Sequence, residues 1–474
     1  MPGASSRRAS VRCCVRAFRP PPEESRMSSS LMISVAGVRG IVGESLTPAV
    51  AARFAAAFSH ALGEGPVVIG RDARVSGPMV LQAVCAGLTA AGRDVVDIGL
   101  ATTPATQMAV EHLKAAGGVI LTASHNPAPW NALKFLSGRG EFLGAAEGKA
   151  VRERFEQDRD LWTTWDKLGS VRSEAGALEW HLARVLGLEY VNVDAIRARK
   201  LKVVVDGCAS VGGVAVPALL ERLGATVVKL DCEPNGRFTR ELEPLPEHLG
   251  ALGKAVLEAK ADFGVALDPD ADRAAFVAAD GKPLGEEFTV VLGTQVVLAV
   301  HKGPVVTNLS TSRMLDKVCE GAGVALHRTP VGEAHVVAAI HAVGAIAGGE
   351  GNGGMILPAA HCGRDGLVAV ALIAQAMARG ATLRELATGL PQYAMVKDKL
   401  ARPDEPWERA ADRLRSVFAD WELDTVDGMR FARGEEWVHV RPSGTEPVVR
   451  VIAETPALVR TREIVEVARK AVEA

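Results

Sequence analysis

The sequence predicts an α/β protein made of three related α/β domains and a smaller C-terminal α+β domain. With 474 residues, the chain is too long to fold around one hydrophobic core. A loose repeat of apolar strand, polar loop, helix, glycine and second apolar strand occurs three times, and residues from 394 onward do not follow it. A strand, a helix and a second strand in this order form the βαβ unit of parallel sheets.

The first copy of the repeat lies between residues 67 and 98. A helix predicted at 48–62 precedes it, because Thr47 is a good N-cap and Pro48 suits the first helical position. The copy consists of an apolar run at 67–69, a loop at 70–77, a helix at 79–91, the C-terminal Gly92 and a second run at 95–98.

The second and third copies have the same plan. The second has a run at 203–205, a loop at 206–213, a helix at 214–223, Gly224 and a run at 226–230. The third has a run at 305–306, a loop at 308–312, a helix at 314–320, Gly321 and a run at 324–326.

The C-terminal part has a different order of elements. The pattern predicts a helix near 407–418, strands at 437–440 and 448–452, and a final helix at 457–472. These elements describe a small α+β unit. The predicted domains therefore span 27–172, 173–280, 281–393 and 394–474.

Residues 1–26 do not belong to this plan. They are rich in arginine, contain three consecutive prolines and have no apolar stretch, which argues against a secretory signal. An Arg-rich start is also typical of organelle transit peptides. We favour a disordered tail, or an upstream start with Met27 as the true beginning.

Composition and charge exclude several classes of function. A net charge of -2 argues against a general nucleic-acid or membrane-surface binder, and 4% aromatic residues offer few platforms for stacking bases. No apolar run is long enough to cross a bilayer. The seven cysteines include no Cys-x-x-Cys pair, which favours a reducing compartment and predicts a cytoplasmic protein.

The first candidate loop, 122–127, follows an apolar run at 118–121. Ser124 offers a hydroxyl nucleophile beside the imidazole of His125, at the end of a strand where α/β proteins bind ligands. An ordinary turn is the alternative. No Gly-x-Ser-x-Gly motif surrounds Ser124, so serine-hydrolase chemistry gains no support.

The second loop, 268–273, holds three carboxylates at alternating positions: Asp268, Asp270 and Asp272. Such groups repel one another unless a cation lies between them. Carboxylate oxygens favour Mg²⁺ or Ca²⁺, and the spacing of an EF-hand is absent. A solvated acidic turn is the alternative interpretation.

The third loop, 348–354, contains five glycines around Glu350 and Asn352. Glycines permit a close approach of the backbone to a ligand, and the two polar side chains can bind vicinal sugar hydroxyls. A flexible loop is the alternative.

The fourth loop, 441–447, lies between two predicted strands. It contains Arg441, Ser443, Gly444 and Thr445, and a guanidinium group with hydroxyls and open backbone N–H groups suits a phosphate. A hairpin turn is the alternative. Together the four loops supply a nucleophile, a metal site, a group that recognises hydroxyls and a phosphate anchor, which predicts phosphoryl transfer on a sugar phosphate.

These motifs resemble those of the α-D-phosphohexomutase superfamily, in the family's order and over residues 34–474. The segments that carry the resemblance are 34–40, 122–127, 268–273, 349–354 and 441–447. The resemblance implies four domains around a central cleft, with mixed sheets in the first three.

The resemblance also implies roles for the residues. Ser124 would carry a phosphoryl group and, with Asp268, Asp270 and Asp272, hold one Mg²⁺ per chain. The groups expected near the phosphoserine are Arg39, His125, Lys134 and Arg273, and either His125 or Lys134 would act as general acid/base. Those expected to bind the substrate are Glu333, Glu350, Asn352, Arg441, Ser443, Gly444 and Thr445.

The reaction implied is the interconversion of a sugar 6-phosphate and 1-phosphate. The phosphoserine would give its phosphoryl group to the free hydroxyl, and the resulting sugar bisphosphate would turn end for end before returning its other phosphate to Ser124. The surrounding cations would neutralise the transferred group.

The third loop, which the resemblance identifies as the loop that determines sugar specificity, departs from the commonest family pattern. In this chain Asn352 and Gly354 stand in place of a serine and a histidine. With Glu333, this pattern resembles the phosphoglucosamine mutase branch. A carboxylate at Glu333 suits a 2-ammonium group, whereas a surface helix cap is the alternative. We therefore expect glucosamine phosphate as the substrate, with phosphomannomutase/phosphoglucomutase activity as the alternative.

Two other classes remain as competing hypotheses. One is a metal-dependent phosphatase with Asp268 as nucleophile, and the other is a non-catalytic sugar-phosphate binder. The expected partner is the sugar phosphate alone, without nucleic acid or membrane, in a monomer or a homodimer.

Overall fold

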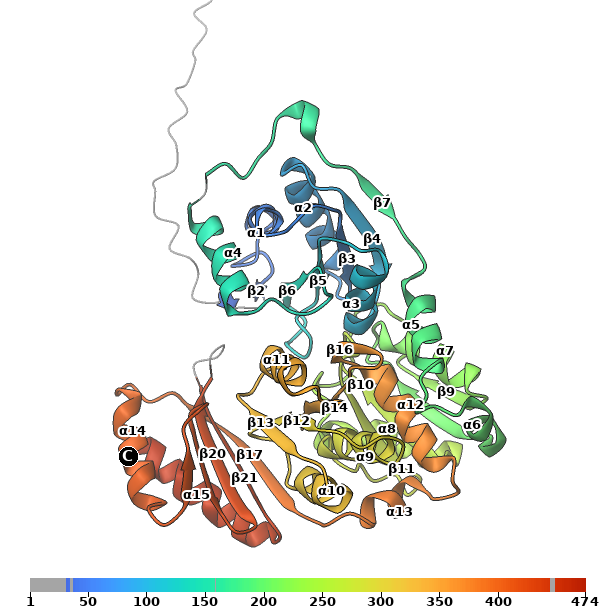
Figure 1. Cartoon of the computed structure of the whole chain (residues 1–474), viewed down its shortest axis with the longest axis vertical. Helices are drawn as coiled ribbons and strands as arrows, with labels where there is room; N and C mark the ends of the chain where they lie inside the picture. Colours follow the sequence, from blue (N-terminus) through green and yellow to red (C-terminus); the bar gives the residue numbers. More distant parts are fainter. Residues whose placement is uncertain (1–30, 35–36, 158, 444–447) are drawn as a thin grey trace, which may run out of the picture.

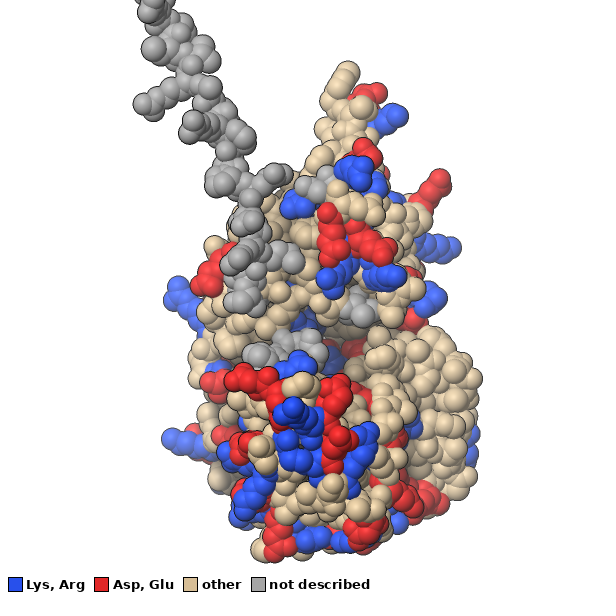
Figure 2. Space-filling view, turned by 90° about the vertical axis from the view of Figure 1, so that its left-hand side faces the viewer, with Lys and Arg blue, Asp and Glu red and all other residues tan. Residues whose placement is uncertain are grey.

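The computed structural model describes residues 31–34, 37–157, 159–443 and 448–474. It contains four sheets, each with its own helices, and Figure 1 shows the first domain above the other three. The first three sheets mix parallel and antiparallel strands, and the fourth is wholly antiparallel. The predicted fold class is therefore confirmed. Figure 2 shows a hollow between the first domain and the fourth.

The first sheet has the strand order β1-β2-β6-β5-β3-β4-β7. Helices cover both of its faces, because one apolar cluster joins the sheet to α1, α2 and α4 and another joins it to α3. The elements are β1 (Met32–Ser34), β2 (Gly37–Ile41), α1 (Pro48–His60), β3 (Val67–Arg71), α2 (Gly77–Ala90), β4 (Val95–Leu100), α3 (Thr103–His112), β5 (Gly117–Leu121), β6 (Trp130–Ser137), α4 (Ala145–Gln157) and β7 (Val171–Ser173).

The second sheet has the order β11-β10-β8-β9, and the third has the order β13-β12-β14-β15-β16. One apolar core is continuous between them. The second region contains α5 (Ala177–Leu186), α6 (Val193–Arg199), β8 (Lys202–Asp206), α7 (Gly212–Arg222), β9 (Thr226–Leu230), α8 (Gly250–Ala259), β10 (Phe263–Leu267) and β11 (Ala274–Ala278). The third contains α9 (Glu287–Leu298), β12 (Val305–Asn308), α10 (Met314–Ala322), β13 (Leu326–Thr329), α11 (Glu333–Val343), β14 (Ala347–Glu350), β15 (Gly354–Leu357), β16 (His361–Arg364), α12 (Gly366–Met377) and α13 (Leu383–Thr388).

The fourth sheet has the order β17-β21-β20-β19-β18 and packs against two helices around its own core. Its elements are β17 (Ala394–Ala401), α14 (Trp407–Val417), β18 (Glu422–Asp424), β19 (Met429–Arg433), β20 (Glu436–Pro442), β21 (Val448–Thr455) and α15 (Leu458–Glu473). No helix in the described part of the chain is both long enough and apolar enough to span a bilayer.

The three predicted βαβ copies are present, with parallel strands in each. The Thr47 side chain caps α1 by accepting from the backbone N–H of Val50, as expected. The third copy needs a correction, because Gly321 lies inside α10 and does not end it. The helix ends at Gly323, which adopts a left-handed φ of 69°, and the following strand begins at Leu326 instead of 324.

Candidate active site

Ser124 lies just beyond the end of β5, in a left-handed conformation with φ of 48°. Its Oγ donates a hydrogen bond of 2.7 Å to Oδ2 of Asp268, which belongs to the second domain. Its backbone N–H donates to the hydroxyl of Thr122, which in turn donates to Asp72. The predicted nucleophile and the aspartate loop are therefore in direct contact.

Arg74 holds the loop around Ser124 through the backbone. The guanidinium group is almost fully buried, is paired with Asp72, and donates hydrogen bonds to four carbonyl oxygens of the loop and its exit. These belong to Ser124, Asn126, Pro127 and Trp130, at 2.6, 2.6, 2.9 and 3.0 Å. Sequence reasoning missed Arg74, although a charged residue in the loop after the first strand of a βαβ copy is a signal for such a role.

Asp268, Asp270 and Asp272 are completely buried, and one carboxylate oxygen from each lies within 4.8 Å of the other two. Burial, together with the negative charges of Asp272 and Asp270, raises the pKa of Asp268 well above its usual value. Burial also acts to raise the pKa of Asp270, but Lys134, with the hydrogen bonds from Thr103 and Asp268, outweighs it and the pKa is lowered.

Two atoms of this trio indicate room for a cation. Oδ1 of Asp270 and Oδ1 of Asp272 are buried and have no hydrogen-bond partner among the described residues. An unpaired buried carboxylate oxygen is costly unless a positive charge compensates it. With Ser124 Oγ beside them, the oxygens form the hard donor set that Mg²⁺ prefers.

Lys134 and Thr103 both bind the central aspartate. The Lys134 Nζ donates to Oδ2 of Asp270 at 2.8 Å, and the Thr103 hydroxyl donates to the same atom at 2.7 Å. Thr103 is the first residue of α3, so this helix of the first domain contacts the second domain at the aspartate loop 268–273. Thr103 was not predicted.

Arg39, His125 and Arg273 lie near the Ser124 loop or the aspartate loop that Ser124 contacts. Arg39 donates to the side chain of Asn126 at 3.2 Å, and Arg273 Nε lies 4.0 and 3.8 Å from oxygens of Asp268 and Asp272. Burial, followed by the charges of Arg273 and Arg39, lowers the pKa of His125 well below its usual value.

Arg364, at the end of β16, connects the second loop (268–273, called the metal loop below) to the third loop (348–354, called the sugar loop below). The guanidinium is buried and donates to Oδ2 of Asp272 at 2.6 Å, to Oε2 of Glu333 at 2.9 Å and to Oε2 of Glu350 at 3.0 Å. Sequence reasoning missed Arg364. The available signal was a charged residue directly before Asp365, which is the N-cap of the strongly apolar α12.

Glu350 ends β14 and is fully engaged by neighbouring donors. Its Oε1 accepts from Asn308 and from the backbone of Gly332, at 2.8 and 2.9 Å. Burial acts to raise the pKa of Glu350, but Arg364, Asn308, Arg273 and the backbone of Gly332 together outweigh it and the pKa is lowered. The side chain of Asn352 accepts from the backbone of Gly354, so it closes the turn between β14 and β15.

Glu333 is the first residue of α11 and is 7% exposed, so the alternative of a surface helix cap is wrong. Burial raises its pKa, although Arg364 opposes the shift. Its Oε1 lies 3.5 Å from the amide nitrogen of Gln107, which comes from α3 of the first domain.

The fourth loop begins at the end of β20. Arg441 Nη1 lies 3.8 Å from Asp427, and burial lowers the pKa of Arg441. Ser443 is buried, and its backbone N–H donates to the carbonyl of Val448 across the loop. Gly444 and Thr445, both predicted to bind phosphate, lie outside the described residues.

Four segments match the domains of one family, described as phosphoglucomutase/phosphomannomutase. Residues 32–161, 181–281 and 285–393 match its alpha/beta/alpha domains I, II and III, and residues 395–471 match its C-terminal domain. This order and number agree with the four sheets.

Individual proteins are similar over nearly the whole chain. A protein named "Probable phosphoglucosamine mutase" from Methanopyrus kandleri is 38% identical over 92% of this chain and 97% of its own length. A "Phosphoglucomutase/phosphomannomutase" from Thermococcus kodakarensis is 37% identical with the same coverage. A crystal structure of a phosphoglucomutase/phosphomannomutase family protein from Burkholderia thailandensis has a TM-score of 0.81 and 28% identity, covering 93% of this chain and 97% of that one.

The four-domain fold and the contact between a serine and an aspartate trio define the class of the phosphohexomutases, which are intramolecular phosphotransferases. The chain belongs to the phosphoglucomutase/phosphomannomutase family. The resemblance stated from the motifs is confirmed, and the activity is that of a sugar-phosphate mutase.

Proposed function

We propose that this mutase uses Ser124 as its phosphoryl carrier and interconverts glucosamine 6-phosphate and glucosamine 1-phosphate. The observation that supports the carrier is the 2.7 Å contact between Ser124 Oγ and Asp268, inside a buried trio of aspartates. The proposed domain boundaries remain those expected from the sequence, at 172, 280 and 393.

One Mg²⁺ per chain fits the oxygens of Ser124, Asp268, Asp270 and Asp272. When bound, it supplies positive charge next to the phosphoryl group. Arg39 and Arg273 add further positive charge around Ser124, and Lys134 holds Asp270 in place. Removal of divalent metal with EDTA is expected to stop turnover, and Mg²⁺ to restore it.

The transfer breaks the bond between the Ser124 oxygen and phosphorus and forms a bond between phosphorus and the free sugar hydroxyl. The proton of that hydroxyl passes to His125 or Lys134, and the oxygen of Ser124 takes up a proton as it leaves phosphorus. The bisphosphate then reorients, and the reverse transfer reverses these proton movements. Arg441 and Ser443 hold the phosphate that does not react. In a preparation free of substrate, intact mass is expected to show one phosphate, on Ser124.

The amino-sugar preference is supported by the relatives named phosphoglucosamine mutase in Methanopyrus kandleri and Methanosarcina acetivorans. The relative from Thermococcus kodakarensis favours phosphomannomutase/phosphoglucomutase activity as the second candidate. The acidic groups Glu333 and Glu350 suit an ammonium group, although Arg364 already binds both.

A panel of substrates tests this proposal. Purified protein with Mg²⁺ is assayed with glucosamine 6-phosphate, mannose 1-phosphate and glucose 1-phosphate, and kcat/KM should be highest for the amino sugar. No turnover of glucosamine 6-phosphate would contradict the preference. Ser124→Ala should abolish turnover of every substrate and remove the phosphate, and an aspartyl phosphate would instead support the phosphatase hypothesis. The cytoplasmic location and the monomeric or homodimeric state remain predictions.

A further inference from the structure

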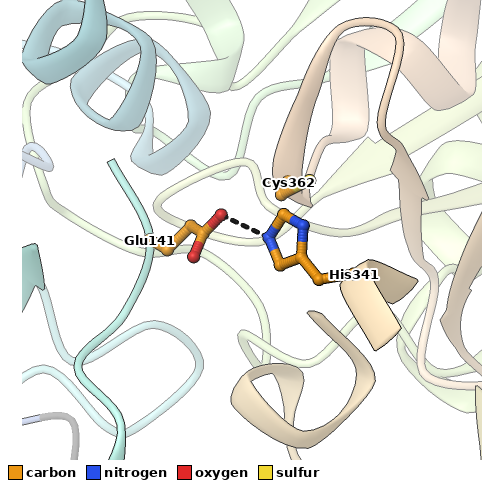
Figure 3. A group of neighbouring side chains, drawn as sticks. All are labelled: Glu141, His341 and Cys362. Carbon is orange, nitrogen blue, oxygen red and sulfur yellow. Dashed lines mark hydrogen bonds and ion pairs between the residues drawn. The ribbon is translucent and has the colours of Figure 1, made fainter. Parts of the chain in front are cut away.

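Three side chains with metal-binding atoms meet where the first domain contacts the third, away from the aspartate trio. They are Glu141, His341 and Cys362, which we call the junction cluster (Figure 3). Glu141 follows β6 of the first domain, His341 lies on α11 and Cys362 on β16. No role in the mutase reaction involves them.

The ligand atoms of the junction cluster are close together. The Nε2 of His341 lies 2.7 Å from Oε1 of Glu141, and one atom from each of the three residues lies within 4.8 Å of the other two. The Glu141 side chain is 9% exposed, that of His341 is 51% exposed, and Cys362 is partly buried. Solvent therefore reaches the cluster from the side of His341.

Tight packing fixes the spacing between the two domains here. Gly140 has φ of 71°, and a Cβ at this position would lie 2.3 Å from the carbonyl oxygen of Gln107. A Cβ at Gly363, next to Cys362, would lie 2.4 Å from the side-chain oxygen of the same Gln107. Gln107 on α3 thus packs between the turn that carries Glu141 and the strand that carries Cys362, so both ligands are held in place.

We propose that the junction cluster binds one zinc-class divalent cation through Glu141, His341 and Cys362, with water as the fourth ligand. Thiolate, imidazole and carboxylate are the three protein ligand types of Zn²⁺, and three protein ligands plus water is a common coordination for it. Binding releases the proton of the Cys362 thiol, and the cation takes the place of the hydrogen bond between Glu141 and His341.

Two carboxylates lie near the sulfur. Burial, followed by the negative charges of Glu141 and Glu111, raises the pKa of the Cys362 thiol to about 11, although Arg139 opposes the shift. A coordinated metal stabilises the thiolate outright. Without metal, Glu141 pairs with His341 and with Arg139, whose side chains are 51% and 73% exposed, and such pairs contribute little.

The position of the site gives metal binding a consequence for the enzyme. Helix α11 begins with Glu333 and strand β16 ends with Arg364, and these two residues form the sugar side of the active site. A cation bound by Glu141, by His341 on α11 and by Cys362 on β16 therefore fixes the first domain, which carries Ser124, against the third domain, which carries the sugar loop.

Titration of the full-length protein with Co²⁺ in saturating Mg²⁺ tests the proposal. Cobalt bound to a thiolate gives a sulfur-to-metal charge-transfer absorption, which cobalt at the sulfur-free aspartate trio cannot give. We expect this band in the unmodified protein at one equivalent, and we expect Zn²⁺ to displace it. Cys362→Ser should abolish the band, and His341→Gln should weaken binding at least tenfold.

Two matched variants serve as controls. Cys85→Ser removes a thiol that is also partly buried but lies in the first domain, on α2. His335→Gln removes a different histidine of α11, the helix that carries His341. Both should keep the band and the affinity. Absence of the band in the unmodified protein, or its persistence in Cys362→Ser, would overturn the proposal. Because His341 is half exposed, His341→Gln remains informative even if Cys362→Ser folds poorly.

Discussion

At the scale of single residues, one guanidinium group organises the acidic part of the active site. Arg364 is buried among Asp272, Glu333 and Glu350, which come from three separate segments. These carboxylates hold the pKa of Arg364 well above its usual range, although burial acts in the opposite direction. A planar group with several donors can satisfy three carboxylates at once, and an ammonium group cannot reproduce that geometry.

Arg364→Lys is expected to lower kcat/KM about 100-fold, because the metal loop and the sugar loop lose their common support. Steady-state kinetics at several Mg²⁺ concentrations should show weaker activation by the metal as well. Arg384→Lys alters an exposed pair with Asp280 and serves as the control. Equal kinetics of the two variants would show that Arg364 has no positioning role.

Arg74 acts on the backbone of the same site, and its replacement should affect both stability and activity. In Arg74→Lys, several buried carbonyl oxygens lose their donors, which costs about 3 kcal/mol or more in the free energy of unfolding. We expect a lower thermal midpoint and a lower kcat, measured by calorimetry and by turnover. Arg139→Lys, at a side chain that is 73% exposed, should change neither.

At the scale of elements, helix packing in the first domain depends on a single small residue. Gly87 on α2 faces α1 so closely that a Cβ there would lie 2.2 Å from the carbonyl oxygen of Ala52. Gly321 on α10 is also helical, but it is exposed, and a Cβ there would have no described atom within 4 Å. The two glycines therefore have opposite surroundings, one crowded and one open.

Gly87→Ala should lower the free energy of unfolding by about 1–3 kcal/mol, because α1 and α2 must separate. Gly321→Ala should raise it by about 0.5–1 kcal/mol, because alanine favours the helix. Thermal unfolding of the two variants measures the contrast, and a shift of the same sign in both would contradict it.

The elements that were predicted well are those with a strong local signal. In each of the three βαβ copies, an apolar run of strand length is followed by a helix and a glycine. These local patterns determine the elements whatever the elements pack against. The strands β18 and β19 were missed because they are short and partly exposed, and β17 because its polar residues hide the alternation. Gly321 was misplaced because the true end of α10 is the second of two nearby glycines.

At the scale of the whole molecule, a charged contact joins the third domain to the fourth. Lys397 on β17 donates to Glu286 at 2.7 Å and to Glu287, at the start of α9, at 3.0 Å. Glu287 also accepts from the backbone of Ser312. Burial raises the pKa of Glu287 to about 7, with Glu286 adding to the shift and Lys397 opposing it.

This shift predicts a dependence of stability on pH. Because the folded pKa exceeds the ordinary value of about 4.3, Glu287 contributes stability that is fully present below pH 4.3 and is lost as the pH rises through 7. Glu287→Gln removes this loss and keeps an acceptor for Ser312. The variant should therefore gain about 2–3 kcal/mol relative to the unmodified protein between pH 4.5 and pH 8.

Thermal midpoints of the variant and of the unmodified protein at pH 5 and pH 8 measure the effect. The midpoint of the variant minus that of the unmodified protein should be a few degrees larger at pH 8 than at pH 5. Glu258→Gln, at a side chain that is 67% exposed, should show no such movement. A pH-independent difference for Glu287→Gln would show that this carboxyl group titrates normally.

The sequence indicated the four candidate loops because each carries its chemistry within a few consecutive residues. Ser124 and the aspartates Asp268, Asp270 and Asp272 lie in such loops, and the structure brings them into contact. Arg74, Thr103 and Arg364 were not predicted, because their partners lie far away in the sequence. The partners of Arg74 lie in its own domain, and Thr103 and Arg364 each bind an aspartate of another domain, so only the folded structure shows what these side chains bind.

The hydrogen bonds of Arg74 have a consequence for repeated turnover. Apart from those to Asp72, they end on main-chain carbonyl oxygens, including that of Ser124, and not on the serine hydroxyl. In the proposed cycle, the scaffold under Ser124 would therefore be the same whether its hydroxyl is free or esterified. The enzyme would then pass between the two proposed covalent forms without rebuilding the loop that presents the hydroxyl.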